Sequence, residues 1–498
     1  MSNFLFSSKS SYILDSLCIK RGLKFDTLME NAGKSSFDII NNKIIPKLEK
    51  FNKKILVMCG PGNNGRDGLV VAKYLQQKNY KVDVFFPLSK LKVKDDLNII
   101  KNFKDLKINK YSIIVDSIFG VGFNRKFSQK IVTFVKKINK SKALKISIDI
   151  ASGIDADSGN LLPISIKAEH TITFAAPKIG HYLLPGKSNS GKIHVVSIGE
   201  KKSEILKASR DLKVKLNIPS VWIKNFKWPT MMDHKYSRGH VLVKSGPLTT
   251  TGASRLSAIS ALRSGAGAVT LSSDANALVV NASHLTSVML KEINNADELS
   301  RFMKEKKIDT VIIGPGSGVN KITKDMIIMT IKEEKSLVLD ADGLTSFEKN
   351  PEELFFYLKN RKKRENIILT PHHGEFNRLF KTSNLNKIEK TSLAANHTNS
   401  TILYKGNDTV ISTPKKETLI SQESSPFLAT AGSGDVLAGI CGSFLAQGMK
   451  SHQAAAAASW LHSEIGLENG PGFIAEDMSK FIAKTISNKL KKLYENGN

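Results

Sequence analysis

The chain has few cysteines and no long, purely apolar run. Its three cysteines, Cys18, Cys59 and Cys441, lie far apart among 498 residues. They indicate neither a disulfide framework nor a Cys-rich metal site, and they favour a reducing cytoplasm. The most apolar long segment, residues 428–446, contains Asp435 and several glycines. It therefore predicts a buried helix entered by a tight turn rather than a membrane span. The N-terminus lacks the features of a secretory signal.

Acidic residues are also scarce, since 74 Lys and Arg face 45 Asp and Glu and give a net charge of +29. The basic residues are scattered singly and in pairs, without a concentrated arm or an aromatic-interleaved basic platform. This pattern favours a solvated lysine-rich surface, so we expect no nucleic-acid and no membrane partner. The positive field would still assist the capture of anionic small molecules.

Two blocks of alternating strands and helices follow each other along the chain. In the first, apolar runs predict strands within residues 53–60, 81–86, 112–120 and 143–153, and residues 69–80 have helical spacing. Strand–helix alternation predicts a mostly parallel sheet with helices on both faces, a Rossmann-like three-layer α/β/α domain. One or two amphipathic helices are expected ahead of it.

The segment from about residue 200 to 228 is lysine-rich and irregular, and we place the domain boundary there. The predicted domains are residues 1–214 and 220–498. The second block repeats the α/β pattern. Its expected strands begin with 239–246, 268–273, 309–318, 336–343, 366–372 and 401–413, and its last helices cover 432–448 and 452–466.

The first block contains the string GPGNNGRDG, from Gly60 to Gly68, between an expected strand and an expected helix. Glycines let the backbone turn tightly and approach a ligand, and the helix start offers unpaired N–H groups that suit phosphate. A bare structural turn is the alternative. The string has neither the spacing of a dinucleotide fingerprint nor the Gly-Lys-Ser/Thr of a Walker A loop.

Two further polar loops follow strands, one with Asp116 and one with Asp149 and Ser152. Ligands of an open parallel sheet gather beyond the carboxyl ends of the strands, where these side chains would converge. Carboxylate, amide and hydroxyl oxygens suit an alkali or alkaline-earth cation. Loop capping is the alternative for any one of these residues taken alone.

The motifs LMENAG, GPGNNGRDGLVVAKYL, VDSIFGVGF, IDIASGIDADSG and TITFAAPKIGHYLLPG resemble, in order, the NAD(P)H-hydrate epimerase family. The resemblance implies potassium ligands at Asn64, Asp116 and Ser152, and a proton-handling role for Asp149. Arg66 stands where the family usually has glycine, where it either clashes with ligand or pairs with a phosphate. The implied substrate-binding residues are Asn63, Asn64, Gly65, Arg66, Asp67, Gly120, Val121, Gly122, Phe123, Asn124, Arg125, Lys126 and Asp149.

The second block carries LATAGSGDVLAGI, which places Gly432, Gly434 and Asp435 at the opening of a helix. Backbone N–H groups there would stabilise charge on a transferred phosphoryl group, and Asp435 would accept the proton of the attacking hydroxyl. The alternative is an N-capped buried helix. The nearby motif TPHHGEF supplies His372 and Glu375.

The ordered motifs RGHVLVKSG, SALRSGAGAVTL, IIGPGSG, LVLDADGL, ILTPHHGEFNRL, YKGNDTVIS, LATAGSGDVLAGI and IAEDM resemble the ADP- or ATP-dependent NAD(P)H-hydrate dehydratase family, which implies a ribokinase-like α/β/α fold and bound magnesium. The implied chemistry is phosphorylation of the hydrate followed by loss of phosphate, with Asp435 as catalytic base. The implied substrate contacts are Ala253, Gly316, Gly318, His372 and Asp435. The implied nucleotide contacts are Lys405, Gly406, Asn407, Asp408, Thr409 and Gly434.

Together the two resemblances predict a metabolite-repair enzyme that epimerises the R and S forms of NAD(P)H hydrate and dehydrates the S form with ADP or ATP. One alternative is a ribokinase-like small-molecule kinase. A second is an N-terminal domain that binds nucleotide without turnover. A homo-oligomer in the cytoplasm is expected.

Overall fold

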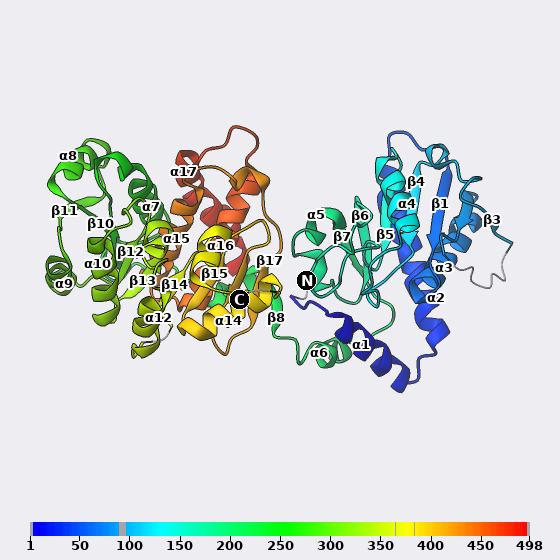
Figure 1. The fold of residues 1–498 in the computed structure, drawn as a ribbon, viewed down its shortest axis with the longest axis horizontal. Helices are drawn as coiled ribbons and strands as arrows, with labels where there is room; N and C mark the ends of the chain where they lie inside the picture. Colours follow the sequence, from blue (N-terminus) through cyan, green and yellow to red (C-terminus); the bar gives the residue numbers. More distant parts are fainter. Residues whose placement is uncertain (1–2, 89–95, 364, 383, 496–498) are drawn as a thin grey trace. The chain divides into compact units, whose positions relative to one another are not determined.

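The structure is a computed structural model that describes residues 3–88, 96–363, 365–382 and 384–495. The chain divides into two compact units, Met1–Val214 and Lys215–Asn498 (Figure 1). Among the described residues, no helix is long and apolar enough to cross a membrane. All three cysteines are buried and free.

In the described part of the first unit, seven strands form a sheet in the order β3-β2-β1-β4-β5-β6-β7. Every neighbouring pair is parallel. The strands are β1 (Lys54–Cys59), β2 (Lys81–Phe85), β3 (Asn98–Ile100), β4 (Ile113–Ser117), β5 (Leu144–Ile148), β6 (His170–Phe174) and β7 (Lys192–Val196).

Both faces of this sheet are covered, because alternate residues of β1 enter different apolar cores. Ile55 and Val57 pack with α2 (Phe25–Ile39) and α3 (Asn63–Gln77), whereas Leu56 packs with α4 (Gln129–Lys140) on the other face. Side chains of a strand alternate between faces, so fully apolar strands need a helix layer on each side. The unit also contains the helices α1 (Ser8–Lys20), α5 (Gly186–Ser190) and α6 (Lys202–Ala208).

The strand order reverses beside β1, because β2 and β3 lie on one side of it and β4 to β7 on the other. The chain runs from β1 to β2 on one side and from β4 to β5 on the other, which leaves a crevice beyond the carboxyl ends of β1 and β4. Such a switch point is the usual ligand site of an open α/β sheet.

In the described part of the second unit, ten strands form one sheet in the order β11-β10-β9-β12-β13-β14-β15-β16-β17-β8. Pairing is parallel from β11 to β15, and β16 and β17 continue antiparallel. The strands are β8 (Val214–Asn217), β9 (His240–Lys244), β10 (Ala268–Ser273), β11 (Met289–Glu292), β12 (Thr310–Ile313), β13 (Ser336–Leu339), β14 (Ile367–Leu369), β15 (Thr401–Tyr404), β16 (Val410–Ser412) and β17 (Thr418–Ser421).

Helices again cover both faces. Val241 and Val243 of β9 pack in the core formed with α7, α15, α16 and α17, while Leu242 between them enters the opposite core. The helices are α7 (Thr251–Arg263), α8 (Ala275–His284), α9 (Ala296–Glu305), α10 (Lys321–Lys332), α11 (Ala341–Thr345), α12 (Pro351–Asn360), α13 (His373–Leu379), α14 (Lys387–Thr398), α15 (Ser433–Ala446), α16 (Ser451–Glu468), α17 (Ala475–Thr485) and α18 (Lys491–Glu495). The α/β class predicted for both halves is confirmed.

The segment between the two blocks is more regular than its composition indicated. Residues 200–228 contain α6 and β8, and β8 is the edge strand of the second sheet beside β17. The side chain of Asn217 also donates to the Ala456 carbonyl at 2.8 Å and accepts from Trp222 at 3.2 Å. The start of the second unit is therefore built from residues ahead of position 220.

Candidate functional site

The loop after β1 turns directly into α3, whose first residue is Asn63. A Cβ on Gly60 would lie 1.7 Å from the Ile118 carbonyl oxygen, and one on Gly65 would lie 1.9 Å from the Gly60 carbonyl oxygen. The glycines therefore permit the loops after β1 and β4 to touch, and the touching loops form the floor of the crevice.

Gly65 gives the first prediction. Gly65→Ala is expected to lower the free energy of unfolding of the first unit by about 1–3 kcal/mol, because the methyl group would overlap a backbone oxygen that has no room to move. Chemical denaturation followed by circular dichroism measures the change. Gly62→Ala is the control, because no atom lies within 4 Å of a Cβ at that position. Equal stabilities of the two variants would contradict this packing argument.

The loops after β1, β4 and β5 are joined by hydrogen bonds that involve Asn64, Asp116 and Ser152. The Asn64 amide donates to the Phe119 carbonyl at 2.9 Å, and the Phe119 N–H donates to the Ser152 hydroxyl at 2.9 Å. The buried Asp116 carboxyl accepts from the Ser152 hydroxyl at 2.6 Å and from Ser147 at 2.9 Å. Burial raises the pKa of Asp116, although these hydrogen bonds oppose it. The Asn64 Oδ1 atom is buried without a partner among the described residues. The predicted potassium ligands Asn64, Asp116 and Ser152 are connected through Phe119 and the Ser152 hydroxyl.

Asp149 follows β5 in a left-handed backbone conformation, with φ of +67°. Its carboxylate lies 2.7 Å from the Lys178 ammonium and accepts the Val121 N–H at 3.2 Å. Burial alone would raise the pKa of Asp149, but Lys178 outweighs it and the pKa is lowered. Asp149 is therefore a buried carboxylate that stays ionised.

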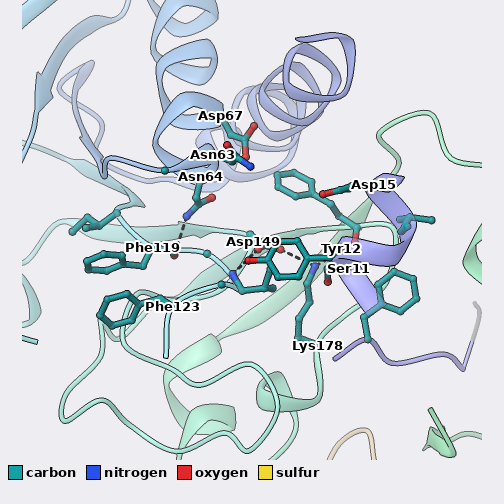
Figure 2. A pocket seen from close by; sticks show the side chains of 18 of the residues that line it. Ser11, Tyr12, Asp15, Asn63, Asn64, Asp67, Phe119, Phe123, Asp149 and Lys178 are labelled. Atoms are coloured by element: carbon teal, nitrogen blue, oxygen red, sulfur yellow. Dashed lines mark hydrogen bonds and ion pairs between the residues drawn. The ribbon is translucent and has the colours of Figure 1, made fainter. Parts of the chain in front are cut away.

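The N-terminal helix α1 contributes the side of the crevice that faces Asp149. Figure 2 shows Tyr12 and Asp15 of α1 around the same pocket as Asn64, Asp67, Asp149 and Lys178. The pocket has a volume of about 430 Å³. It also receives Phe6, Ser11 and Phe174, none of which was singled out from the sequence.

The carboxyl groups of this pocket differ in pKa. Burial raises the pKa of Asp15 to about 6, with a further rise from Asp149 and an opposing effect of Lys178. Burial also raises the pKa of Asp67 well above its usual range, with added repulsion from Asp149 and Asp15. The pocket therefore combines one carboxyl with a lowered pKa, Asp149, and two with a raised pKa, Asp15 and Asp67.

The residues predicted from the epimerase resemblance divide into two groups. Nine line the pocket: Asn63, Asn64, Asp67, Gly120, Val121, Gly122, Phe123, Arg125 and Asp149. The described lining does not include Gly65, Arg66, Asn124 or Lys126, and Arg66, Asn124 and Lys126 are exposed. Lys178 and Asp15 are the functional side chains that the sequence patterns did not single out.

Arg66 gives the second prediction. It lies in the first turn of α3, and its side chain is exposed and is not part of the described pocket lining. Arg66→Gly is therefore expected to change the epimerase rate by less than about twofold, and to lower stability by about 1 kcal/mol because glycine weakens a helix. Rate assays and thermal unfolding test both effects, and a large gain in rate would place Arg66 in the substrate path.

In the second unit, α15 is preceded by its N-cap residue Gly432 in a left-handed conformation, φ +85°, and carries Asp435 in its first turn. Residues 436–446 of this helix are all buried. Asp435 and Gly432 line a cavity of about 530 Å³ together with Ala253 and Leu256 of α7 and Glu476 of α17. A helix start that faces a cavity offers N–H groups to an anion, and Asp435 is placed to meet a hydroxyl beside it.

Burial and four charged residues determine the pKa of Asp435. Burial raises the pKa of Asp435 to about 7, with further rises from Asp340, Asp342 and Glu375 and an opposing effect of Lys405. The Lys405 ammonium lies 2.5 Å from Asp340 and 3.9 Å from Glu375. A carboxyl with pKa near 7 exchanges its proton readily at neutral pH, as a general base requires.

The other predicted substrate contacts lie on neighbouring loops. The Gly316 carbonyl accepts from the Thr250 hydroxyl at 2.7 Å, and a Cβ on Gly316 would lie 3.3 Å from the Ala253 Cβ. The Gly318 N–H donates to the Asp342 carboxylate at 2.9 Å. The loop after β12 is therefore held against the start of α7, next to the cavity that contains Asp435.

The remaining predicted residues are His372 and those of the β15–β16 hairpin, which follow the strands β14 and β15. His372 is the N-cap of α13, where its Nδ1 accepts from the Gly374 and Glu375 N–H groups, and its side chain is half-exposed. Lys387, the first residue of α14, forms an ion pair with Asp408 of the hairpin at 2.5 Å. Within the hairpin, the Thr409 hydroxyl donates to the Gly406 carbonyl at 2.7 Å. Lys405 connects this hairpin to the Asp435 cluster, because a Cβ on Gly434 would lie 3.4 Å from its ammonium.

Comparison with known proteins assigns a family to each unit. Residues 25–180 match the family described as YjeF-related protein N-terminus, and residues 241–488 match NAD(P)H-hydrate dehydratase. The chain is 31% identical over 499 residues to the bifunctional NAD(P)H-hydrate repair enzyme Nnr of Moorella thermoacetica, covering 93% of this chain and 92% of that protein. The same enzyme of Archaeoglobus fulgidus is 31% identical over 503 residues, covering 96% of this chain and 98% of that protein.

Two solved structures each resemble somewhat more than half of the chain. A ribokinase-like superfamily protein from Enterococcus faecalis is 22% identical over 57% of this chain and 96% of its own, with a TM-score of 0.49. An ADP/ATP-dependent NAD(P)H-hydrate dehydratase from Bacillus subtilis, co-crystallised with ATP and Mg²⁺, is 21% identical over 55% of this chain and 96% of its own, with a TM-score of 0.45. From the near full-length sequence matches, the chain belongs to the family of bifunctional NAD(P)H-hydrate repair enzymes.

Proposed function

We propose that the first unit interconverts the R and S epimers of NAD(P)H hydrate. The observation that supports this best is the Asp149–Lys178 ion pair at 2.7 Å inside a pocket of about 430 Å³ at the strand switch point. Epimerisation at the hydrated carbon requires ring opening and reclosure, and both steps need a proton acceptor. Asp149 is the acceptor, because Lys178 keeps it ionised.

The second unit dehydrates the S epimer with ADP or ATP as the phosphoryl donor. Asp435 removes the proton of the substrate hydroxyl, whose oxygen then attacks the terminal phosphorus of the donor. The N–H groups at the start of α15 face the transferred group and stabilise its negative charge. Loss of phosphate from one ring carbon and of a proton from its neighbour restores the dihydropyridine. The observation that supports this role best is the position of Asp435 in the first turn of α15, where it lines a cavity of about 530 Å³.

The oxygen cluster of the first unit fits a potassium ion. Asn64 Oδ1 is buried without a partner in the described part of the chain. Asp116 and Ser152, which are connected to Asn64 through Phe119, add a carboxylate and a hydroxyl. These are hard donors of the kind that alkali cations prefer. A potassium ion held there would supply fixed positive charge next to the carboxylate-lined pocket.

Magnesium in the second unit would arrive with the nucleotide. Among the described residues, no three His, Cys, Asp or Glu side chains are grouped to hold a metal ion by themselves. Magnesium commonly keeps several waters and binds through one or two carboxylates plus substrate phosphates. Asp340 and Asp342, which both act on the pKa of Asp435, are the nearest candidates for such carboxylates. Lys405 to Thr409 and Gly434 would contact the nucleotide.

The test supplies purified protein with both hydrate epimers, magnesium and potassium, with ADP, ATP or neither, and follows the reduced-nicotinamide absorbance to completion. Nucleotide-dependent recovery of the whole mixture is expected. Recovery that stops at one epimer would contradict epimerase activity. A stable phosphorylated product without recovered cofactor would replace the dehydratase by a small-molecule kinase. A homo-oligomer and a cytoplasmic location stay predictions.

A further inference from the structure

The pocket of the first unit has a second wall that the family match does not cover. Helix α1 ends at Lys20, before residue 25, where the match to the YjeF-related family begins. This helix nevertheless turns Tyr12 and Asp15 into the pocket (Figure 2). A Cβ on Gly122 would lie 2.1 Å from the Tyr12 hydroxyl, so α1 lies directly against the loop after β4.

Several contacts hold α1 in this position. Phe6, just before the helix, forms a parallel bridge with Lys178, in which the Phe6 N–H donates to the Pro177 carbonyl at 2.8 Å. The Ser8 N–H and hydroxyl both donate to Asp157 at 2.6 Å. Arg21 forms an ion pair with Glu204 at 2.8 Å at the other end. Asp15 is therefore fixed by contacts on both sides of it along the chain.

The Asp15 carboxyl has a suitable environment for proton transfer. It is half-buried, and it has no hydrogen-bond or ion-pair partner among the described residues. The charged groups that face it are Asp67 of α3, Asp149 after β5 and Lys178 after β6. Asp149 is already paired with Lys178, so an incoming substrate finds one ionised carboxylate and one uncommitted carboxyl in the same pocket.

We propose that Asp15 is the proton donor of the epimerase site and acts together with Asp149, a role that rests on the proposed epimerase function. Asp149 takes the proton of the hydroxyl on the hydrated carbon. As the carbonyl forms, the bond from that carbon to the ring nitrogen breaks, its electron pair passes to nitrogen, and Asp15 protonates the nitrogen. Rotation about the adjacent carbon–carbon bond presents the other face of the aldehyde. Reclosure returns the nitrogen proton to Asp15, and Asp149 protonates the oxygen.

Asp67 is the competing candidate, because it also faces the pocket. Its accessibility favours Asp15. The Asp67 side chain is buried, whereas Asp15 is half-buried and lines the pocket from helix α1. A pKa of about 6 also allows Asp15 to release and recover a proton near the working pH.

The experiment follows conversion of one purified hydrate epimer into the other by chromatography, without nucleotide, for the full chain and its variants. Asp15→Asn is expected to lower kcat about 100-fold with little change in KM, within the usual contribution of a general acid. The wild type is expected to lose kcat/KM at high pH as Asp15 ionises, and Asp15→Asn should not show this fall. Asp15→Glu should recover part of the rate. Asp26→Asn is the matched control, because Asp26 is exposed in the first turn of α2.

The dehydratase rate of Asp15→Asn on the S epimer should equal that of the wild type and reports that the second unit has folded. Chemical denaturation followed by circular dichroism reports separately whether the first unit has folded, and Asp15→Asn should unfold there like Asp26→Asn. A wild-type chain that does not epimerise would contradict the proposed function itself. An active wild type whose Asp15→Asn variant matches Asp26→Asn would overturn the role of Asp15 alone. A larger loss of kcat for Asp67→Asn than for Asp15→Asn would assign the donor to Asp67 and also overturn the proposal.

Discussion

Asp435→Asn is expected to lower the dehydratase kcat/KM about 10³-fold and to leave the epimerase rate unchanged. The substitution keeps the size of the side chain but removes its ability to accept a proton, and a general base contributes about 10²–10⁴ to a rate. The α15 start and its N–H groups would remain in place, because residues 436–446 are buried whatever the charge at position 435. Absorbance recovery with purified S epimer and nucleotide measures the loss. A variant within tenfold of the wild type would show that another group accepts the proton.

The raised pKa of Asp435 also predicts how activity and stability depend on pH. Activity needs the ionised form, so dehydratase kcat/KM should fall about tenfold per pH unit below about pH 7. Stability has the opposite sign. Between the ordinary pKa of about 3.9 and the folded value, the folded chain binds more protons than the unfolded one, so stability decreases as pH rises. Asp435→Asn should remove this decrease and be relatively more stable at pH 8 than at pH 5.

The two glycine-rich loops were predictable from sequence because their function depends on local backbone chemistry. GPGNNGRDG required close backbone approach, and Gly60 and Gly65 provide it. The motif around Asp435 indicated a helix start that faces a ligand, and α15 begins at Ser433 with a cavity in front of it. In both cases a short string specifies a turn, and the parallel sheet places the turn at the ligand-binding edge.

Asp15 and Lys178 were not predictable in this way, because their positions depend on contacts distant in sequence. Asp15 is one polar residue on an amphipathic helix. Its position at the pocket depends on long-range contacts of that helix, among them the Phe6–Lys178 bridge and the Ser8–Asp157 hydrogen bonds. Lys178 sits within a motif already noted, yet lysine is almost never fully buried unless it is paired. Its partner is 29 residues earlier in the chain, so no local pattern connects the two.

Arg66 shows the converse limit. The sequence indicated a side chain close to the ligand, because Arg66 stands where the family usually has glycine and the backbone approaches the ligand. In the structure Arg66 is exposed and lies outside the described pocket lining, whereas Asn63, Asn64 and Asp67 of the same helix start line the pocket. Which side chains of a helix start face a pocket depends on how the helix packs against the neighbouring loops, and a short motif does not specify that packing.

Lys178→Met is expected to lower the epimerase kcat/KM about 10³-fold and the free energy of unfolding of the first unit by about 3–5 kcal/mol, the usual cost of leaving one member of a buried ion pair alone. Lys178 is 2% exposed, and its ammonium also donates to the Thr173 hydroxyl at 2.7 Å. Without it, burial would raise the pKa of Asp149, and the carboxyl would be neutral and unable to accept a proton at neutral pH.

The sign of the pH effect distinguishes this mechanism from simple unfolding. In the wild type the pKa of Asp149 is lowered, so the contribution of the pair is present above the ordinary pKa of about 3.9 and is lost as pH falls through the lower folded value. In Lys178→Met, stability should instead decrease as pH rises above about 4, because ionising Asp149 is now unfavourable. Denaturation of Lys178→Met at several pH values measures this reversal, and Lys178→Met/Asp149→Asn is the matched control. The double variant should regain most of the stability and none of the activity, because it removes the buried carboxyl that has lost its partner together with the proton acceptor. Equal stabilities of the single and double variants would show that the loss of lysine packing, rather than the unpaired carboxyl, destabilises the unit.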